Sequence, residues 1–377
     1  MDFTLSKEQE LIRKMMRSFA ENEVKPIAAE IDRTSRYPAE NVAKLFRLGV
    51  MGMTVPKAYG GAGADTLSSA IVTEELARVC ASTSDIVAGH GLCFGPIHAH
   101  GTEEQKRKYL PLLTHSVLGG FALTEPNAGS DASKSQTTAV LDGDRYIMNG
   151  AKCFITNGSE AGIFVVFAMT DPSKGNRGIS AFIVESGFPG FSVGKHEEKM
   201  GLHGVPTTEL VFTDCIVPKE NMLGKEGRGF PIAMQTLDGG RIGIAAQALG
   251  IAEGALNEAK EYTKGRVQFG KPISKFQNTQ FTFADMEMGC EAGRLLTYQA
   301  AVLKGQGVRY TKEAAMAKLW CSEHAMKTTT KALQMFGGYG YTKDYPMERM
   351  MRDAKITEIY EGTSEVQRIV ISANMGL

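Results

Sequence analysis

The sequence has no excess of either charge, because Lys plus Arg and Asp plus Glu each number 42. A chain without net basic charge lacks the electrostatic signature of nucleic-acid binding, so no nucleic-acid partner is expected. Long apolar runs are also missing. The longest uninterrupted one, from Ile163 to Met169, is far shorter than the roughly 20 residues that a membrane-spanning helix needs. We therefore expect no association with a membrane.

Metal-binding patterns are absent as well. The six cysteines are scattered without a Cys-x-x-Cys pair, which argues against a zinc or iron–sulfur site and favours buried free thiols in a reducing compartment. The histidines show no metal spacing, so we predict no metal and interpret His90, His98 and His100 as structural. The segment Met1–Ser6 has no apolar signal core and no Arg-rich leader, which predicts a cytoplasmic protein. A processed mitochondrial-matrix form would look similar.

What the chain does have is enough length and apolar content for several packed units. Its 377 residues exceed the size at which one hydrophobic core stops growing, and 43% of them are hydrophobic. The texture changes from helical to β-rich around Gly119 and returns to long periodic segments near Gly229. We expect an α+β protein with an N-terminal α-helical domain (1–118), a middle β-barrel domain (119–226) and a C-terminal four-helix-bundle domain (227–377).

Individual elements follow from periodicity, caps and turn signals. Ser6 and Gln9 form a capping-box pattern, and apolar residues then recur at helical spacing until Pro26. The pairs Asp142–Gly143, Asn149–Gly150 and Asn157–Gly158 are turn signals between strands. Further predicted helices are Ala39–Leu48, Thr66–Val79, Glu103–Leu112, Met234–Thr263, Phe276–Lys304 and Lys312–Met335, and predicted strands are Thr137–Leu141, Tyr146–Asn149, Ile163–Thr170, Ile179–Val184 and Glu209–Val217.

Two unusual strings carry the functional signal. One runs from Arg352 to Glu365 and contains Tyr-Glu-Gly-Thr at positions 360–363; the other runs from Phe121 to Asp131 and supplies hydroxyls and glycine. A lone Glu-Gly pair says nothing, but these strings occur together and in order. The chain resembles the acyl-CoA dehydrogenase family over essentially its whole length. In texture it is closest to the short-chain and butyryl-CoA dehydrogenases, through the segments 235–243 and 356–368.

The resemblance implies FAD-dependent interconversion of a short-chain acyl-CoA and its trans-2-enoyl-CoA, with electrons exchanged through an electron-transferring flavoprotein. It also implies a homotetramer, because some cofactor contacts come from a neighbouring subunit. Acyl length, branching and the direction of the reaction stay open. Two alternatives remain: a short-chain acyl-CoA oxidase, and a catalytically inactive flavin-binding assembly protein.

By resemblance Glu361 is the base that removes the proton next to the thioester carbonyl. Burial beside a ligand would raise its pKa, as suits such a base. Some relatives, of the isovaleryl and long-chain type, instead carry the base at the position of Gly240. Glycine cannot take a proton, so Glu361 is the family-type candidate in this chain.

The remaining positions are also implied by resemblance. Phe154 stands where many relatives have tryptophan, so stacking on the flavin is retained without an indole hydrogen bond. Arg266 suits a pyrophosphate because its guanidinium donates two hydrogen bonds at once. The implied FAD-binding residues are Phe121, Leu123, Thr124, Ser130, Phe154, Thr156, Arg266, Phe269, Gln277, Gln334, Gly337, Gly338, Thr363 and Glu365, and the implied substrate-binding residues are Ser130, Asp238, Arg241, Tyr360 and Gly362.

Overall fold

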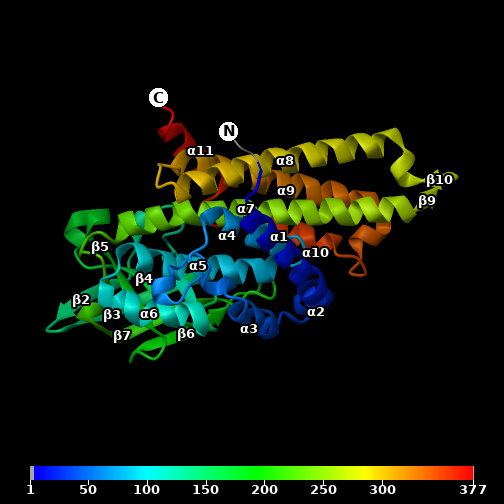
Figure 1. Ribbon diagram of the computed structural model, residues 1–377. Helices are drawn as coiled ribbons and strands as arrows, with labels where there is room; N and C mark the ends of the chain where they lie inside the picture. Colours follow the sequence, from blue (N-terminus) through cyan, green and yellow to red (C-terminus); the bar gives the residue numbers. More distant parts are fainter. Residues whose placement is uncertain (1–3, 377) are drawn as a thin grey trace.

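The computed structural model describes residues 4–376, so Met1–Phe3 of the predicted N-terminal start lie outside the described residues. Helices form both ends of the chain and a sheet forms its middle (Figure 1). Met16 near the N-terminus, Phe164 in the sheet and Ala252 in the C-terminal part belong to one continuous buried core. The three parts therefore pack on one another. Within the described residues, no helix is long and apolar enough to cross a membrane.

The N-terminal part is helical, as expected. Its helices are α1 (Lys7–Phe19), α2 (Lys25–Thr34), α3 (Ala39–Arg47), α4 (Thr66–Ala77), α5 (Ala81–His100) and α6 (Glu103–His115). The capping box at Ser6 and Gln9 is present. The predicted end of the first helix at Pro26 is wrong, because a π-helical turn (Ala20–Val24) leads into α2, where Pro26 occupies a first-turn position. Proline lacks the N–H that a regular helical turn would use, and the π-helical turn directly before it lets the helical stretch continue past Pro26.

The middle part is one eight-stranded sheet with the order β6-β7-β3-β2-β4-β5-β8, and β1 pairs in parallel with β4. Because β6 and β8 form the edges, the predicted barrel is open. The strands are β1 (Leu118–Ala122), β2 (Thr138–Asp142), β3 (Arg145–Thr156), β4 (Ala161–Met169), β5 (Ile179–Glu185), β6 (Phe191–His196), β7 (Thr207–Pro218) and β8 (Met222–Leu223).

One of the three predicted turns is wrong. Asp142–Gly143 does connect β2 to β3, and Asn157–Gly158 does follow the end of β3. Asn149–Gly150, however, lies inside β3, which continues to Thr156 through a register shift against β7. Gly150 has φ 139° and lies against Thr137, where a Cβ would clash. The glycine therefore serves a bulge within a strand.

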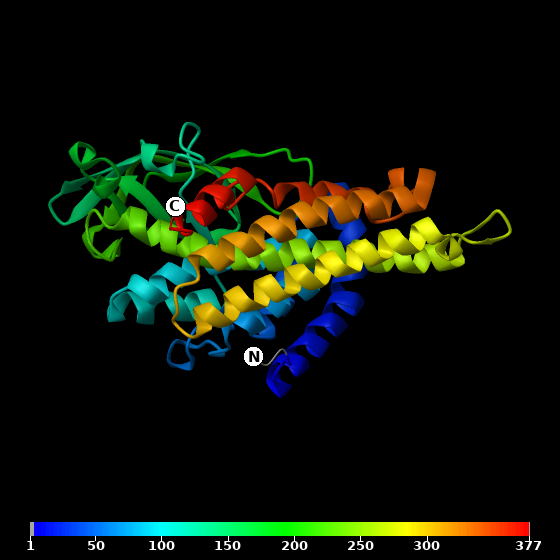
Figure 2. The same cartoon turned by 90° about the horizontal axis from the view of Figure 1, so that it is seen from above.

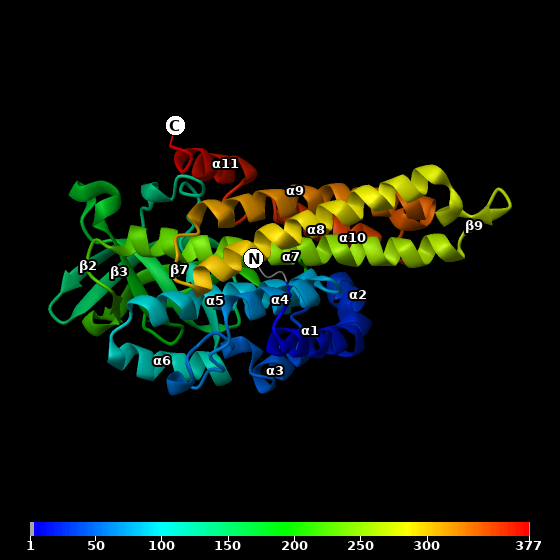
Figure 3. The same cartoon turned by 45° about the horizontal axis from the view of Figure 1, so that its top comes forward.

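The C-terminal part contains α7 (Gly229–Gly265), a short hairpin of β9 (Val267–Gln268) and β10 (Lys271–Pro272), α8 (Gln277–Gly305), α9 (Thr311–Phe336), α10 (Met347–Ile356) and α11 (Ser364–Ala373). The long helices α7, α8 and α9 run side by side, and the hairpin projects beyond their ends (Figure 2). α11 packs on α9 at the end nearer the sheet (Figure 3). The three predicted long helices are confirmed, although α7 begins five residues before the predicted Met234.

Two glycines set the distance between α4 and α7, which join the N-terminal and C-terminal parts. A Cβ at Gly250 would overlap the carbonyl oxygen of Glu74, and a Cβ at Gly254 would overlap that of Arg78. These obstacles are backbone atoms, which cannot rotate away. The two helices can therefore approach this closely only because α7 carries glycine at both positions.

We predict that Gly254→Ala lowers the thermal unfolding midpoint, because overpacking of a buried contact typically costs about 1–3 kcal/mol. The matched control is Gly265→Ala at the end of the same helix, where an added Cβ meets no atom within 4 Å. Differential scanning calorimetry of both variants checks this. An unchanged midpoint for Gly254→Ala would show that α4 and α7 can separate without cost.

Candidate functional site

Glu361 lies in a tight turn between α10 and α11. The turn is strained: Glu361 has φ 56° and Gly362 has φ 92°, and a non-glycine residue seldom adopts the left-handed region. The hydroxyl oxygen of Thr363 then caps α11 by accepting from the N–H of Val366 at 3.3 Å. This turn directs the Glu361 side chain at α7, where a Cβ on Gly240 would overlap its carboxylate. The glycine at position 240 leaves room for the carboxylate.

The carboxylate is set up to exchange a proton. Its Oε2 is buried and has no hydrogen-bond partner among the described residues. Burial raises the pKa of Glu361 to about 7, while Arg241 opposes that shift, Asp85 adds to it and Lys318 opposes it. A carboxyl group whose pKa lies near neutrality and whose oxygen is unpartnered has the properties of a general base.

Glu361 borders a cavity of about 480 Å³ between α5 and α7. Glycines line both walls: Gly91 and Gly95 come from α5, and Gly239 and Gly243 come from α7. Small-molecule sites commonly have volumes of roughly 300–1,000 Å³. The cavity is therefore large enough for an acyl group to lie beside the carboxylate.

The predicted substrate residues Asp238 and Arg241 contact each other. The buried Arg241 guanidinium donates to Asp238 Oδ1, and Asp238 Oδ2 accepts from the hydroxyl of Thr311 at 2.7 Å. The ion pair of Arg241 with Asp238 is therefore buried, and Arg241 Nε has no partner among the described residues. Ser130 lies apart from this pair, on an exposed loop outside the lining of the cavity.

Tyr360 is held in a buried polar network. Its hydroxyl donates to Gln247 Oε1, and Gln247 Nε2 donates to the carbonyl of Ala81 at 3.1 Å and to Asp85 Oδ1 at 3.5 Å. Burial raises the pKa of the Tyr360 hydroxyl well above its usual value, and burial raises that of Asp85 to about 6. The network fixes Tyr360, and with it the start of the turn that carries Glu361.

The two strings implied to bind flavin in the sheet lie side by side. Phe121 is on β1, with Leu123 and Thr124 just beyond it, while Phe154 and Thr156 are on β3. The N–H of Cys153 donates to the carbonyl of Thr124 at 2.9 Å, which joins the two segments. Together they place hydroxyls and aromatic rings at one end of the sheet.

Phe154 shows how these residues fit a flat cofactor. It has φ 57°, and 63% of its surface is exposed, although it belongs to a strand whose neighbours are buried. A strained, exposed aromatic side chain is costly unless a ligand covers it. An isoalloxazine ring stacking on Phe154, with Thr124 and Thr156 close by as hydrogen-bonding groups, suits this position.

A buried ion pair between Lys152 and Glu125 holds the Leu123–Thr124 segment in place. The Lys152 ammonium donates to Glu125 Oε1 at 2.6 Å, to the Leu123 carbonyl at 3.1 Å and to Ser135 Oγ at 3.1 Å. Burial lowers the pKa of Lys152 to about 8, and the Lys152 charge holds that of Glu125 at about 2 against its own burial. Both groups are therefore ionised at neutral pH, and the pair fixes the segment that carries Thr124.

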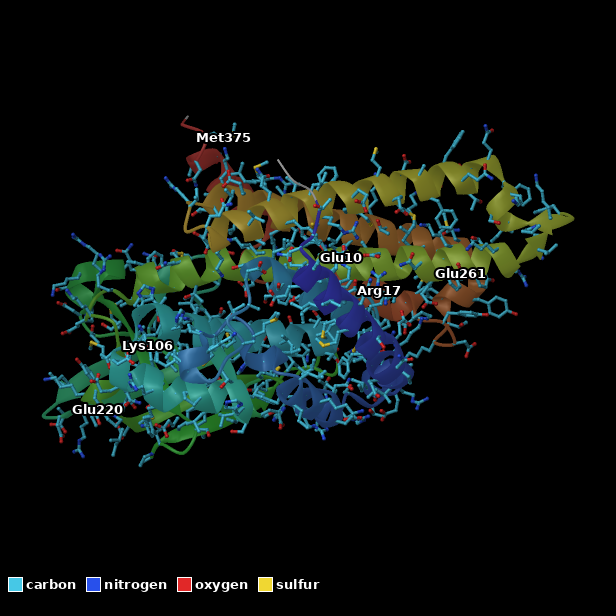
Figure 4. All side chains as sticks on the ribbon, in the orientation of Figure 1. Glu10, Arg17, Lys106, Glu220, Glu261 and Met375 are labelled. Atoms are coloured by element: carbon cyan, nitrogen blue, oxygen red, sulfur yellow. The ribbon has the colours of Figure 1, made fainter. Side chains whose placement is uncertain are left out.

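Other residues implied to bind FAD lie at the opposite end of the molecule. Arg266, Gln334, Gly337 and Gly338 line a second cavity of about 510 Å³, whereas Phe269 is 94% exposed in the hairpin. Gln277, at the start of α8, is exposed and lies outside that lining, as do Thr363 and Glu365 near the base. Figure 4 shows the separation: Glu261 lies near the hairpin, and Glu220 lies beside the sheet at the other end. One chain does not bring the two groups together.

Metal ligands do not gather anywhere in residues 4–376: no group of three or more His, Cys, Asp or Glu side chains could hold an ion. His90 is structural, because its Nδ1 accepts from the N–H of Gly119 and its Nε2 donates to the carbonyl of Leu113, both at 2.9 Å. His98 and His100 line the cavity beside Glu361. The six cysteines are free and buried, as predicted.

Four residues near the base were missed from the sequence, namely Asp85, Gln247, Lys318 and Gln367. Asp85 left a signal: it is the acidic residue of α5, in a segment that is otherwise apolar, small or histidine. Lys318 and Gln367 sit in ordinary-looking helical patterns of α9 and α11. The contact of Lys318 with the turn joins residues 44 positions apart in the sequence, so no local pattern reveals it.

The fold and the site define a class. A buried, proton-accepting carboxylate faces an acyl-sized cavity between helices, and an aromatic and hydroxyl platform for a flavin lies at the end of the adjoining sheet. These features belong to an FAD-dependent oxidoreductase that acts on a CH–CH group.

The chain belongs to the acyl-CoA dehydrogenase family. It matches the N-terminal, middle and C-terminal domains of acyl-CoA dehydrogenase over residues 6–116, 120–215 and 227–376. It is 62% identical to a short-chain specific acyl-CoA dehydrogenase of Clostridium acetobutylicum, with 100% of both chains covered. These matches confirm the resemblance drawn from the sequence.

Solved structures agree with the family assignment. The butyryl-CoA dehydrogenase from Megasphaera elsdenii superposes with a TM-score of 0.98 at 52% identity, covering 100% of both chains. A chain in a structure of the electron transferring flavoprotein of Acidaminococcus fermentans also has a TM-score of 0.98, at 56% identity over 99% of this chain and 98% of that one.

We predict that Gly240→Ala lowers turnover by about 100-fold, because a displacement of about 1 Å at a reacting group costs that much. The added methyl would push the Glu361 carboxylate aside. Only the end of a flexible side chain has to move, so the thermal unfolding midpoint should stay near that of the wild type. Steady-state kinetics and calorimetry check this pair of outcomes, and unchanged turnover would contradict the placement of Glu361.

Proposed function

We propose that the protein catalyses the FAD-dependent α,β-dehydrogenation of a short-chain acyl-CoA to trans-2-enoyl-CoA, or the reverse reduction, and exchanges electrons with an electron-transferring flavoprotein. The unpartnered, buried Oε2 of Glu361 at the acyl-sized cavity is the observation that carries the proposal. The names of the short-chain and butyryl-CoA relatives support a short acyl chain in the substrate. The electron transferring flavoprotein structure supports the redox partner.

Glu361 and the bound FAD have separate roles in the proposed reaction. Glu361 takes the proton from the carbon next to the thioester carbonyl, and the proton resides on its carboxylate. Bound FAD supplies the acceptor for the hydride from the neighbouring carbon. The backbone N–H of Glu361 donates to the thioester oxygen and stabilises the charge that develops there, a kind of contribution worth roughly 3–4 kcal/mol. The helices α5 and α7 exclude water from the acyl group.

The proposal includes a homotetramer. The hairpin of β9 and β10 and the start of α8 lie at the end of the chain opposite the sheet (Figure 2). Arg266, Phe269 and Gln277 belong to that end and Thr124 and Phe154 to the sheet end, so the first three would complete an FAD site on a neighbouring copy. Arg266 and Gly337 would meet the pyrophosphate of that neighbour's FAD. Exposed apolar side chains along α8, Phe281, Met288 and Leu295, support burial against another subunit. The six buried free thiols support the proposed cytoplasmic location.

We predict that Glu361→Gln lowers the rate of flavin reduction by about 10²- to 10⁴-fold, the usual contribution of a general base, while FAD stays bound. Glutamine keeps the size of the side chain but cannot accept the proton. Anaerobic stopped-flow bleaching of the flavin by butyryl-CoA measures the rate. Subsequent addition of the electron-transferring flavoprotein or of oxygen separates a dehydrogenase from an oxidase. Full activity of the variant would refute the mechanism.

The pH dependence has a definite sign. Dehydrogenation needs Glu361 deprotonated, and its pKa is about 7, so kcat/KM should fall as the pH drops below about 7 and level off above it. Reduction of the enoyl-CoA needs the same group protonated, so its kcat/KM should fall as the pH rises above about 7. Initial rates in both directions between pH 5.5 and 9 test this. Profiles of the same sign would exclude a shared proton carrier.

A further inference from the structure

Lys318, on α9, is a buried cation that the proposed chemistry does not use. Its side chain is 0% exposed, and its ammonium donates to the carbonyl of Gly362 at 2.8 Å. Among the described residues no carboxylate forms an ion pair with it at hydrogen-bonding distance. Burying an ammonium ion costs several kcal/mol unless nearby groups compensate it. The contacts of Lys318 must therefore compensate the free energy that burying its ammonium group costs.

The neighbouring turn supplies part of that compensation. The carbonyls of Glu361 and Gly362 accept hydrogen bonds from side chains of α9 and α11. Gln367 Nε2 donates to both of them, at 3.1 and 2.7 Å, and Lys318 donates to the second. Since both turn residues have positive φ, the turn needs such contacts to persist. Lys318 and Gln367 therefore clamp the turn, in the sense that their hydrogen bonds to its two carbonyls hold its conformation.

Charge supplies the other part. Arg241 forms an ion pair with Asp238, whereas Lys318 has no such carboxylate and donates to the carbonyl of Gly362, the residue after Glu361. Against the larger effect of burial, both cations lower the pKa of Glu361, Arg241 more strongly than Lys318. Burial lowers the pKa of Lys318 to about 8, and Glu361 opposes that shift. The ammonium is thus protonated at neutral pH. The charged or titratable groups that interact with Glu361 are Arg241 on α7, Asp85 on α5, Lys318 on α9 and the neighbouring Tyr360. Those that interact with Lys318 are Glu361, Arg241, Glu358 and Glu365.

We propose that Lys318 is a positioning residue for the base: its hydrogen bond to Gly362 holds the strained turn that presents Glu361, and its positive charge, together with that of Arg241, favours the ionised carboxylate that the arriving acyl-CoA meets. The inference rests on the proposed function of Glu361. Lys318 neither gives up nor takes a proton in the reaction. Asp85, on α5, acts in the opposite sense on the same carboxylate, because its negative charge raises the pKa of Glu361.

The direct test is the titration of the Glu361 carboxyl group in the holoenzyme. Protein labelled with ¹³C at the glutamate side-chain carboxyl is followed by NMR, and the Glu361 signal is assigned by its loss in Glu361→Gln. Lys318→Met should raise the titration midpoint by about one pH unit, a typical effect of removing a close opposite charge. Asp85→Asn should lower the midpoint. An unchanged midpoint in a folded Lys318→Met protein would overturn the inference.

Two further variants separate charge from support of the turn. Lys318→Gln keeps a hydrogen-bond donor for Gly362 without the charge, and should also raise the midpoint; it serves if Lys318→Met does not fold. Gln367→Met removes turn contacts without removing a charge, so it should slow the reaction equally at every pH and leave the midpoint in place. A midpoint shift in Gln367→Met equal to that in Lys318→Gln would overturn the role of the charge.

Kinetics give the functional readout. Because the pKa of Glu361 is about 7, a rise of its titration midpoint by one pH unit should lower kcat/KM for dehydrogenation by Lys318→Gln about fivefold at pH 7 and about tenfold well below it, and kcat/KM should recover toward pH 9. Lys318→Arg, which keeps the charge, should recover most of the loss at pH 7. A loss that is equal at every pH would reduce Lys318 to a structural residue. Failure of Glu361→Gln to slow flavin bleaching would instead refute the proposed function, so the two failures are distinguishable.

Discussion

One unpaired carboxylate oxygen is the constraint around which this molecule is arranged. Leaving a buried polar group without a hydrogen bond costs about 1–3 kcal/mol, and more for a charged one. Oε2 of Glu361 is such a group. A conformation that exposed it to water would be favoured unless the surrounding structure prevented it. The strained turn, its two clamping side chains and the glycine at position 240 together prevent it, and in return the carboxylate keeps a pKa near neutrality.

The helix α7 explains how the fold meets this constraint. It packs against α4, α5, α8, α9 and α10, and so touches both helical parts of the chain. It also carries Asp238, Gly240, Arg241 and Gln247, which contact the base or its neighbours. Gly250 and Gly254 let α4 approach, and Gly240 makes room for the Glu361 carboxylate. The packing that stabilises the protein and the packing that shapes the site are therefore formed by the same element.

The sequence predicted what depends on local pattern and on motif resemblance. The long helices followed from their 3.6-residue period, and Glu361 followed from its string. The helix α5 was missed because its glycines, histidines and Pro96 resemble a loop, although a helix that is largely buried needs no polar face. The bulge at Gly150 was taken for a turn because Asn-Gly is the usual turn pair. Both errors arise where tertiary packing overrides local preference.

The residues that tune the base could not be predicted for a different reason. Lys318 contacts the turn across 44 positions of sequence and Tyr360 contacts Gln247 across 113, so no local spacing connects them. A buried lysine and a surface lysine look alike in a helical pattern. Only the folded structure shows that Lys318 is buried and that no carboxylate of the described residues forms an ion pair with it.

The residues at positions 240 and 361 constrain each other, because their side chains would occupy the same space. A side chain on Gly240 would enter the space that the Glu361 carboxylate occupies, so this point can be reached either from α7 or from the turn after α10. A carboxylate from both positions would place two like charges in contact, and Asp85 already raises the pKa of Glu361. A further negative charge would leave the base protonated at neutral pH. Because a protonated carboxyl group cannot accept the substrate proton, a base at position 361 excludes a second carboxylate at position 240, and because even a Cβ there would overlap the Glu361 carboxylate, it requires glycine.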